Sequence, residues 1–199
     1  MLNRVFTKTY TLGQIDKREV LRYAGHKGED VAGVEETLQA CIKASENAFS
    51  CRVCYTAISL DGLPSGWKNS TLVKNRLQNA SYVVLFAATV GLEIDRLILK
   101  EESVSPVKAL LLQSLGAERI ESLCEQFCQE IKKECEKQGY FTTARFSAGY
   151  GDFPLEEQKT LFDLLRPEKH IGLTLNSSLL MSPSKSVTAI IPIGKSDCQ

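Results

Sequence analysis

The sequence has no surplus of either charge and no long apolar run. Its 24 lysines and arginines equal its 24 aspartates and glutamates over 199 residues, so the formal net charge is zero. A domain that binds nucleic-acid phosphates usually carries a basic surplus, so we expect no nucleic-acid partner. The longest apolar run, residues 82–92, is too short to span a bilayer, and we expect no membrane partner either.

Targeting and catalytic signals are also missing. Residues 1–13 lack the apolar segment of a secretory signal, which predicts a cytoplasmic protein with reduced thiols. There is no HExxH, GxSxG, Walker A or GxGxxG sequence, and His26 and His170 are the only histidines. The residue chemistry therefore argues against a hydrolase and against those modes of phosphate binding.

Several helices are predicted from capping residues and apolar spacing. Asp16 and Glu19 have the spacing of a capping box, which opens a short helix that Gly25 can end. Ser105 and Pro106 open a long amphipathic helix that the charged residues 132–139 close, and shorter helices are expected from about residue 93 and over 155–165. Another helix is predicted from about Asp30. Its apolar stripe consists of Val31, Val34, Leu38, Ile42 and Phe49.

Strands are predicted over residues 51–60, 82–88, 173–181 and 187–193. Residues 82–88 are continuously apolar and rich in β-formers, which is typical of a central strand buried on both faces. The last two strands are expected to form a hairpin, and residues 61–70 are interpreted as an exposed loop. Since strands and long helices mix without βαβ alternation, the predicted class is α+β, a mixed or antiparallel twisted sheet with long amphipathic helices.

The seven cysteines do not form a recognisable metal motif. Cys51 and Cys54 make a CxxC pair, but a zinc or iron–sulfur site needs further ligands, and positions i and i+3 of a strand face opposite sides. Cys124 and Cys128 share the apolar face of a helix and are interpreted as small buried hydrophobes. A redox or metal site that uses Cys51, Cys54 and Cys198 is the weaker alternative.

Residues 145–152, RFSAGYGD, form the most distinctive segment, which we call the binding strip. Its small residues and two glycines let a ligand approach the backbone closely. Arg145 offers a fork for a carboxylate, and Tyr150 supplies an aromatic face with a hydroxyl. Such a strip suits a zwitterionic ligand that carries a nucleoside, although an ordinary tight loop has the same composition.

The strip and its flanking segments resemble the C-terminal activation domain of cobalamin-dependent methionine synthase. Residues 86–95, FAATVGLEID, resemble the family block F-A-x-T-x-G-L-E-x-D, and residues 145–150 match R-x-x-x-G-Y. Residues 168–193, EKHIGLTLNSSLLMSPSKSVTAIIPI, resemble the closing block. Three blocks in the family's order make the resemblance more specific than any one motif, and it covers about residues 81–193.

The resemblance implies a domain that binds S-adenosylmethionine and docks over a cobalamin held by a partner protein. When that cobalamin is oxidised to cob(II)alamin, an electron from a flavodoxin-type donor and the methyl group of S-adenosylmethionine restore methylcobalamin. The expected function is reductive reactivation of a cobalamin-dependent methionine synthase or related corrinoid protein. The chain would then be a methyltransferase subunit without a complete catalytic centre of its own.

Carried over by position, the resemblance assigns ligand binding to five residues of the strip. Arg145 is expected to engage the carboxylate or backbone part of the methionine moiety. Ser147 and Ala148 would offer main-chain contacts to the adenosyl part, and Gly149 would allow close approach. Tyr150 is expected to contact the nucleoside and to face the corrin.

Two acidic positions of the family differ in this chain. The acid on the long helix aligns with Ser122, with Glu121 and Glu125 as neighbours, and a second acid before the strip aligns with Gly139. The departures keep open an alternative, a non-catalytic adaptor that docks on a corrinoid protein and controls its conformation.

The chain also has no cobalamin-binding motif of its own. We therefore expect a free-standing activation subunit that works on a separate corrinoid protein. Residues 81–199 would form the activation core with the binding strip, and residues 1–80 a helical and strand segment of the same domain.

Overall fold

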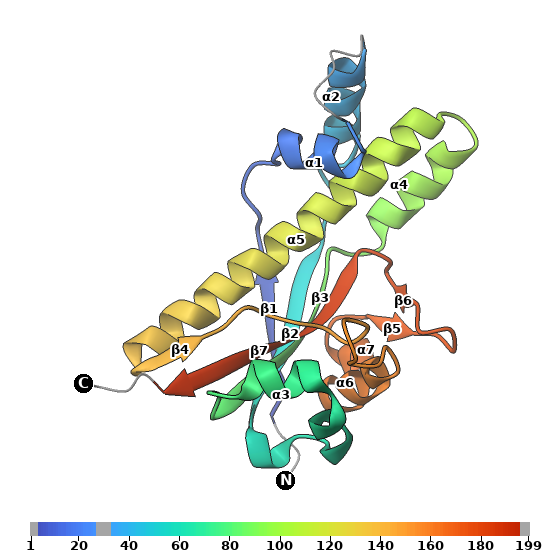
Figure 1. Ribbon diagram of the computed structural model, residues 1–199. Helices are drawn as coiled ribbons and strands as arrows, with labels where there is room; N and C mark the ends of the chain where they lie inside the picture. The colour runs from blue at the N-terminus through green and yellow to red at the C-terminus, as the bar shows by residue number, and fades with distance from the viewer. Residues whose placement is uncertain (1–3, 27–32, 196–199) are drawn as a thin grey trace.

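The computed structural model describes residues 4–26 and 33–195, and its centre is a five-stranded antiparallel sheet with helices on both faces (Figure 1). The strands follow the order β1 (Phe6–Tyr10), β2 (Cys51–Ser59), β3 (Tyr82–Thr89), β7 (Ser186–Lys195) and β4 (Tyr140–Thr142). A separate pair consists of β5 (Thr174–Leu175) and β6 (Met181–Ser182). The predicted α+β class with an antiparallel sheet is confirmed.

Strand β3 contributes to the core on both of its faces. Every residue from Val83 to Thr89 is buried, as the run of apolar residues predicts. Because successive side chains of a strand point to opposite sides, alternate residues enter two different hydrophobic clusters. The first cluster takes Val84, Phe86 and Ala88, and the second takes Val83, Leu85 and Ala87.

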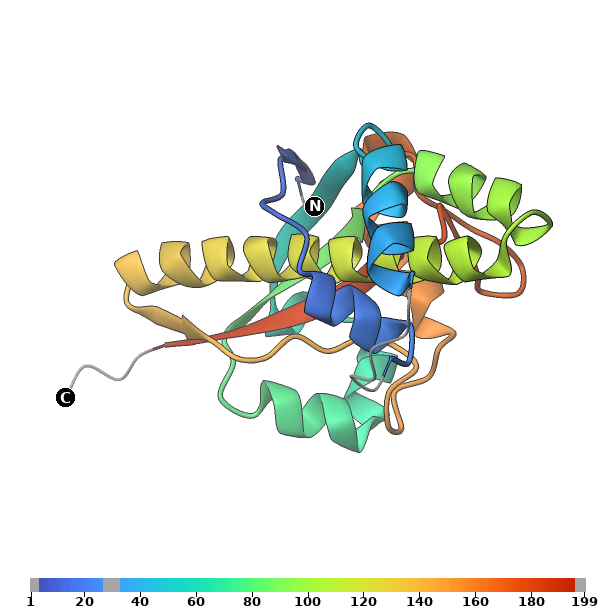
Figure 2. The ribbon, with the colours of Figure 1, turned by 90° about the horizontal axis from the view of Figure 1, so that it is seen from above.

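The first face of the sheet is covered by α5 (Pro106–Lys137), which crosses the strands diagonally (Figures 1 and 2). Phe127 anchors it, with its ring centroid 4.9 Å from that of Phe86 and 5.2 Å from that of Tyr55. The predicted start of α5 is confirmed, since the Ser105 side chain accepts a hydrogen bond from the backbone of Lys108. Around α5 pack α1 (Lys17–Tyr23), α2 (Val34–Ala44) and α4 (Glu93–Glu102).

None of the helices in residues 4–26 and 33–195 combines the length and apolarity that a membrane span requires.

The second face is covered by shorter elements. These are the 3₁₀ turns η1 (Leu60–Gly62) and η2 (Ser65–Asn69) and the helices α3 (Thr71–Leu77), α6 (Glu157–Leu165) and α7 (Pro167–His170). The prediction of an exposed loop over residues 61–70 is wrong at Trp67, which is 1 % exposed. Its indole N–H donates to Glu157 Oε2 at 2.6 Å, which gives the buried donor the acceptor it needs. Helix α3 was not predicted, and neither was β1.

The predicted hairpin of residues 173–181 and 187–193 is also wrong. Strand β7 pairs instead with β3 on one edge, where Phe86 lies opposite Ala189, and with β4 on the other. The segment before β7 is held by Asp95 of α4, which accepts hydrogen bonds from Ser184 N and Oγ at 2.7 and 2.6 Å. The backbone of the buried β3 needs partners on both edges, and this requirement outweighs the local turn signal.

Two helix predictions are confirmed only in part. Asp16 caps α1 by accepting from the backbone of Arg18 and Glu19, but the return bond of a capping box is absent, since Glu19 pairs with Arg22. The Asp16 backbone N–H donates instead to Glu118 of α5. Helix α2 ends at Ala44, so Phe49 lies beyond it, and the predicted start at Asp30 and Val31 lies outside the described residues.

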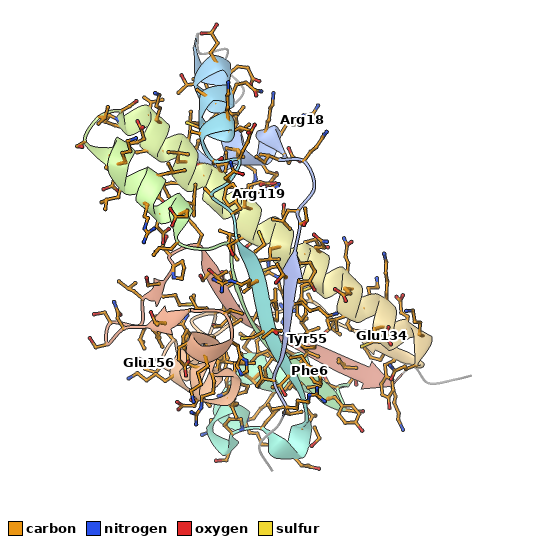
Figure 3. All side chains as sticks on the ribbon, turned by 180° about the vertical axis from the view of Figure 1, so that it is seen from behind. Phe6, Arg18, Tyr55, Arg119, Glu134 and Glu156 are labelled. Atoms are coloured by element: carbon orange, nitrogen blue, oxygen red, sulfur yellow. The ribbon has the colours of Figure 1, made fainter. Side chains whose placement is uncertain are left out.

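A buried ion pair in α5 holds the segment before α1. The Glu118 and Arg119 side chains are 4 % and 5 % exposed, and they bond to each other. Arg119 also donates to the carbonyl oxygens of Gly13 and Gln14, at 2.8 and 3.1 Å. In Figure 3, Arg119 lies where α5 meets this N-terminal segment. Its guanidinium is therefore occupied by protein acceptors.

We predict that Gly194→Ala lowers the free energy of unfolding by about 1–3 kcal/mol, the usual cost of overpacking. A Cβ at this position of β7 would overlap the Phe141 ring and the Asn79 carbonyl oxygen. The measurement is a urea unfolding curve, with Gly13→Ala as control because a Cβ there meets nothing within 4 Å. Equal midpoints for the two variants would contradict the close packing at Gly194.

Candidate functional site

The binding strip begins along the outer edge of β7. Beyond β4, the Thr143 N–H donates to Pro192 O at 3.1 Å, and Phe146 and Ile190 exchange two backbone hydrogen bonds of 3.0 and 2.9 Å. This pairing places Phe146 in the second core cluster, where it lies beside Phe153. The backbone of the strip is therefore positioned by the sheet.

Arg145 extends from the strip to α5. Its Nη2 donates to Glu121 Oε2 at 2.5 Å, and the Arg145 side chain is 26 % exposed. Ser122, which aligns with the family's helix acid, donates instead to Glu118 of the buried ion pair at 3.0 Å. Gly139 lies in the turn between α5 and β4 with φ +75°. The acid that meets Arg145 is thus Glu121.

A tight turn follows Arg145 and exposes the end of the strip. The Gly149 N–H donates to Phe153 O at 2.9 Å, and the Phe153 N–H donates to Tyr150 O at 3.0 Å. Gly149 has φ +89°, and a Cβ there would lie 3.1 Å from Leu155 Cδ1, so both backbone conformation and space favour glycine. Ala148 is buried, whereas Tyr150 is 68 % exposed. The turn therefore presents the Tyr150 ring to solvent.

Asp152 joins the strip to α3. Its carboxylate accepts from the Ser70 hydroxyl at 2.7 Å and from the backbone N–H groups of Thr71 and Leu72 at 2.6 and 2.9 Å. These hydrogen bonds, the Ser70 bond first among them, hold the pKa of Asp152 well below its ordinary value. The first turn of α3 is thereby fixed against the strip.

Two grooves adjoin at Arg145. The first, which we call the strip groove, has a volume of about 510 Å³ and lies between the strip and α3. Its walls are Leu72, Arg76, Arg145, Phe146, Ser147, Tyr150 and Gly151. The second, of about 320 Å³, lies between α5 and residues 142–145 and includes Glu125 and Lys132. The strip groove has the size typical of small-molecule sites.

A further groove, of about 540 Å³, lies between residues 10–17, α2 and α5. Arg119 lines it, but its guanidinium already bonds to Glu118 and to two carbonyl oxygens. The strip groove instead combines two arginines, an exposed aromatic residue and a glycine-containing backbone. We therefore take the strip groove as the candidate site.

Among the cysteines in residues 4–26 and 33–195, none lines the strip groove. Cys51 and Cys54 enter opposite core clusters, as the strand spacing predicts. Burial raises the pKa of the Cys51 thiol to about 11 and that of Cys54 to about 12. Cys198 lies outside the described residues, and Cys124, a buried residue of α5, has a pKa that burial raises to about 12. These thiols are poor nucleophiles at neutral pH.

The sequence matches the family model described as "Vitamin B12 dependent methionine synthase, activation domain" over residues 70–196, more than half of the chain. The chain belongs to this family. No curated protein sequence matches it. Among solved structures it is similar to the "MetH Reactivation Domain bound to AdoHcy", with a TM-score of 0.67 and 18 % identity. That likeness covers 99 % of this chain and 80 % of the other and shows the shared fold.

Four of the five strip residues proposed from the sequence lie in or beside the strip groove. Arg145, Ser147 and Tyr150 line it, and Gly149 forms the adjoining turn, whereas the Ala148 side chain is buried and only its backbone remains for a contact.

Sequence reasoning missed the opposite wall of the groove, formed by α3. Ser70 is an N-cap residue that could have indicated this helix, because its hydroxyl accepts from the Val73 N–H. No local pattern predicted that Asp152, 82 positions away from Ser70, would bind the same turn.

We predict that Asp152→Asn lowers the urea midpoint and flattens its dependence on acid pH. Because the folded-state pKa of Asp152 is depressed, its stabilisation is full above the unfolded pKa of about 3.9 and is lost as the pH falls below that value. The measurement is urea unfolding at about pH 7 and about pH 3. The control is Asp163→Asn on the exposed side of α6, which should keep the acid dependence of the wild type. If the urea midpoint of Asp152→Asn depends on acid pH as strongly as that of the wild type, the role of Asp152 is refuted.

We also predict slow alkylation of Cys51, Cys54 and Cys124 by iodoacetamide in the native protein at about pH 8, because burial keeps these groups as thiols. Mass spectrometry of native and urea-unfolded samples gives the modified positions. Rapid native labelling of Cys51 and Cys54 would revive the redox interpretation of this pair.

Proposed function

We propose that this chain binds S-adenosylmethionine in the strip groove and acts in the cytoplasm in the reductive reactivation of a cobalamin-dependent methionine synthase or a related corrinoid protein. The observation that carries the proposal is the strip groove itself, built by the R-x-x-x-G-Y residues of a chain that belongs to the activation-domain family. The similar solved structure is bound to AdoHcy, S-adenosylhomocysteine, and this supports the proposal because the compound is S-adenosylmethionine without its methyl group.

The proposed reaction consumes one electron and one methyl group. A flavodoxin-type donor supplies the electron to cob(II)alamin on the partner protein. The sulfonium carbon–sulfur bond breaks as the methyl group passes to cobalt, which leaves methylcobalamin and S-adenosylhomocysteine. The corrin supplies the metal chemistry, and this chain supplies the methyl donor in the correct position.

Different residues of the strip bind different parts of S-adenosylmethionine. Arg145, held by Glu121, directs guanidinium donors toward the amino-acid part of the ligand. The backbone of Ser147, Ala148 and Gly149 contacts the adenosyl part, and the φ of +89° at Gly149 gives this segment its turn. The exposed ring of Tyr150 contacts the nucleoside and faces the corrin of the docked partner.

The second candidate is the non-catalytic adaptor. It is favoured by the polar contacts beside the strip, which leave neither Glu121 nor Ser122 free for a ligand there. Glu121 is already paired with Arg145, and Ser122, at the position of the family's helix acid, donates to Glu118. In that case the chain docks on a corrinoid protein and controls its conformation without donating a methyl group.

Arg145→Ala is predicted to weaken S-adenosylmethionine binding by about 10- to 100-fold, the usual effect of losing charge-assisted hydrogen bonds. Calorimetric titration with S-adenosylmethionine and S-adenosylhomocysteine measures this change. Glu121→Gln is the matched control, since it removes the charge that faces Arg145 but keeps the guanidinium.

Unchanged affinity of the Arg145→Ala variant would remove Arg145 from the site. If the wild type shows no saturable binding at millimolar ligand, either alone or with the corrinoid protein present, the adaptor function is the correct one.

A further inference from the structure

Strand β1 forms one edge of the five-stranded sheet. Its residues, Phe6 to Tyr10, all pair with β2, which Figure 3 shows beside it with Phe6 and Tyr55 labelled. Among residues 4–26 and 33–195, no strand pairs with the other side of β1. The outer side of an edge strand carries unpaired backbone N–H and C=O groups, which can bind another strand. This edge of the sheet is therefore available to a partner strand.

The β1 edge lacks the features that usually protect an edge strand, which are proline, a bulge, a very short strand or a free charge. Its sequence, FTKTY, contains no proline, and it pairs with β2 residue for residue without a bulge. The one charged side chain, Lys8, is paired with Glu130 of α5. The strand at the opposite edge, β4, has only three residues. Of the two edges, β1 is thus the less protected.

The sequence of β1 is nearly symmetric about Lys8. In both directions from Lys8 the chain has a threonine and then an aromatic residue. In an antiparallel pair with a second copy, centred on Lys8, Thr7 lies opposite Thr9 of the other copy. Phe6 likewise lies opposite Tyr10 of the other copy. Thr–Thr and aromatic–aromatic pairs across neighbouring strands stabilise a sheet, so β1 is complementary to itself.

The side chains that would meet in such a pair are accessible. Thr7 and Thr9 lie on the same side of β1, and both are exposed. Phe6, on the other side, is 43 % exposed, and its ring stacks on Tyr55 of β2 with 5.6 Å between the centroids. The pairing would extend this aromatic contact across the edge of the sheet.

The charges at the centre of the pair balance. Two copies of Lys8 would face each other, and like charges directly opposite destabilise a sheet. Each Lys8, however, bonds to Glu130 of its own chain, and Glu130 also accepts from the Tyr10 hydroxyl at 2.6 Å. The two lysines and two glutamates together carry no net charge.

We propose that two copies of this chain form an antiparallel dimer through β1, centred on Lys8. The two sheets then join into one continuous sheet. A two-fold axis makes each contact occur twice and closes the assembly at two copies. The binding strip begins beside β7, toward the opposite edge of the sheet, so the dimer leaves the strip groove of each copy open.

The test changes the charge at the two exposed threonines. Thr7→Lys combined with Thr9→Lys places like charges opposite each other twice in the dimer, whereas Thr7→Lys combined with Thr9→Glu places opposite charges there. The control is Ser177→Lys combined with Ser178→Lys, which adds two positive charges at exposed positions between β5 and β6. Sedimentation equilibrium at several protein concentrations gives the dissociation constant of each dimer.

We expect the wild type to dimerise with an affinity in the micromolar range or weaker, since the interface of one strand pair is small. The variant with two lysines in β1 should dimerise about tenfold more weakly because of the two like-charged pairs. The variant with Thr9→Glu should dimerise at least as strongly as the wild type, and the control should match the wild type. Thermal unfolding at low concentration should be unchanged, because all four positions are exposed.

Amide hydrogen exchange tests the same contact without a substitution. Exchange at residues 6–10 of the wild type should slow as the protein concentration rises, because the dimer pairs the outer side of β1. Exchange at residues 140–142 of β4 should not depend on concentration.

Four results would overturn the proposal. One is a wild type that stays monomeric at about 1 mM, or whose exchange at residues 6–10 is independent of concentration. Wild-type dimer affinity in the variant with two lysines in β1 would place the contact on another surface. An equal loss of affinity with Thr9→Lys and with Thr9→Glu would exclude the pairing centred on Lys8. An equal loss in the Ser177 and Ser178 control would attribute the effect to net charge.

Discussion

The two-sided burial of β3 is the constraint on which the rest of the structure depends. From Val83 to Thr89 no residue of this strand is exposed, so its backbone must find hydrogen-bond partners in other strands and each face needs an apolar cover. Strands β2 and β7 supply the partners, and α5 and the layer of η2, α3 and α6 supply the covers. Segments from both ends of the chain are thereby drawn to one strand.

The candidate site is a consequence of that arrangement. Because β3 takes β7 as its neighbour, the outer edge of β7 becomes available to residues 140–146, which carry the start of the binding strip. The strip then lies between two elements that the core holds on opposite faces of the sheet. Arg145 reaches α5 through Glu121, and Asp152 reaches α3 through its first turn. The strip groove forms where the strip, leaving this edge of the sheet, faces α3.

The chemistry of the described residues suits an activation domain that acts on a cofactor of another protein. The reactive metal of the proposed reaction belongs to a partner, so the chain needs no perturbed nucleophile or metal ligand, and its described thiols at Cys51, Cys54 and Cys124 are buried with raised pKa values. In the proposed function, its contribution is a fixed backbone turn at Gly149, an exposed aromatic ring and charges of defined position. Each of these depends on the packing of elements far apart in the sequence.

The sequence by itself determined the features that are local: the α5 start at Ser105, the buried run of β3 and the composition of the strip. It did not determine which strands β7 joins, that Trp67 is buried, or that Glu121 rather than Ser122 meets Arg145. Caps and apolar runs act within a few residues, so their signals can be seen in the chain alone. Strand partners and charge pairs depend on which distant surfaces must be covered together. The placement of Arg76 across from Arg145 was therefore decided only when the two faces of β3 were buried.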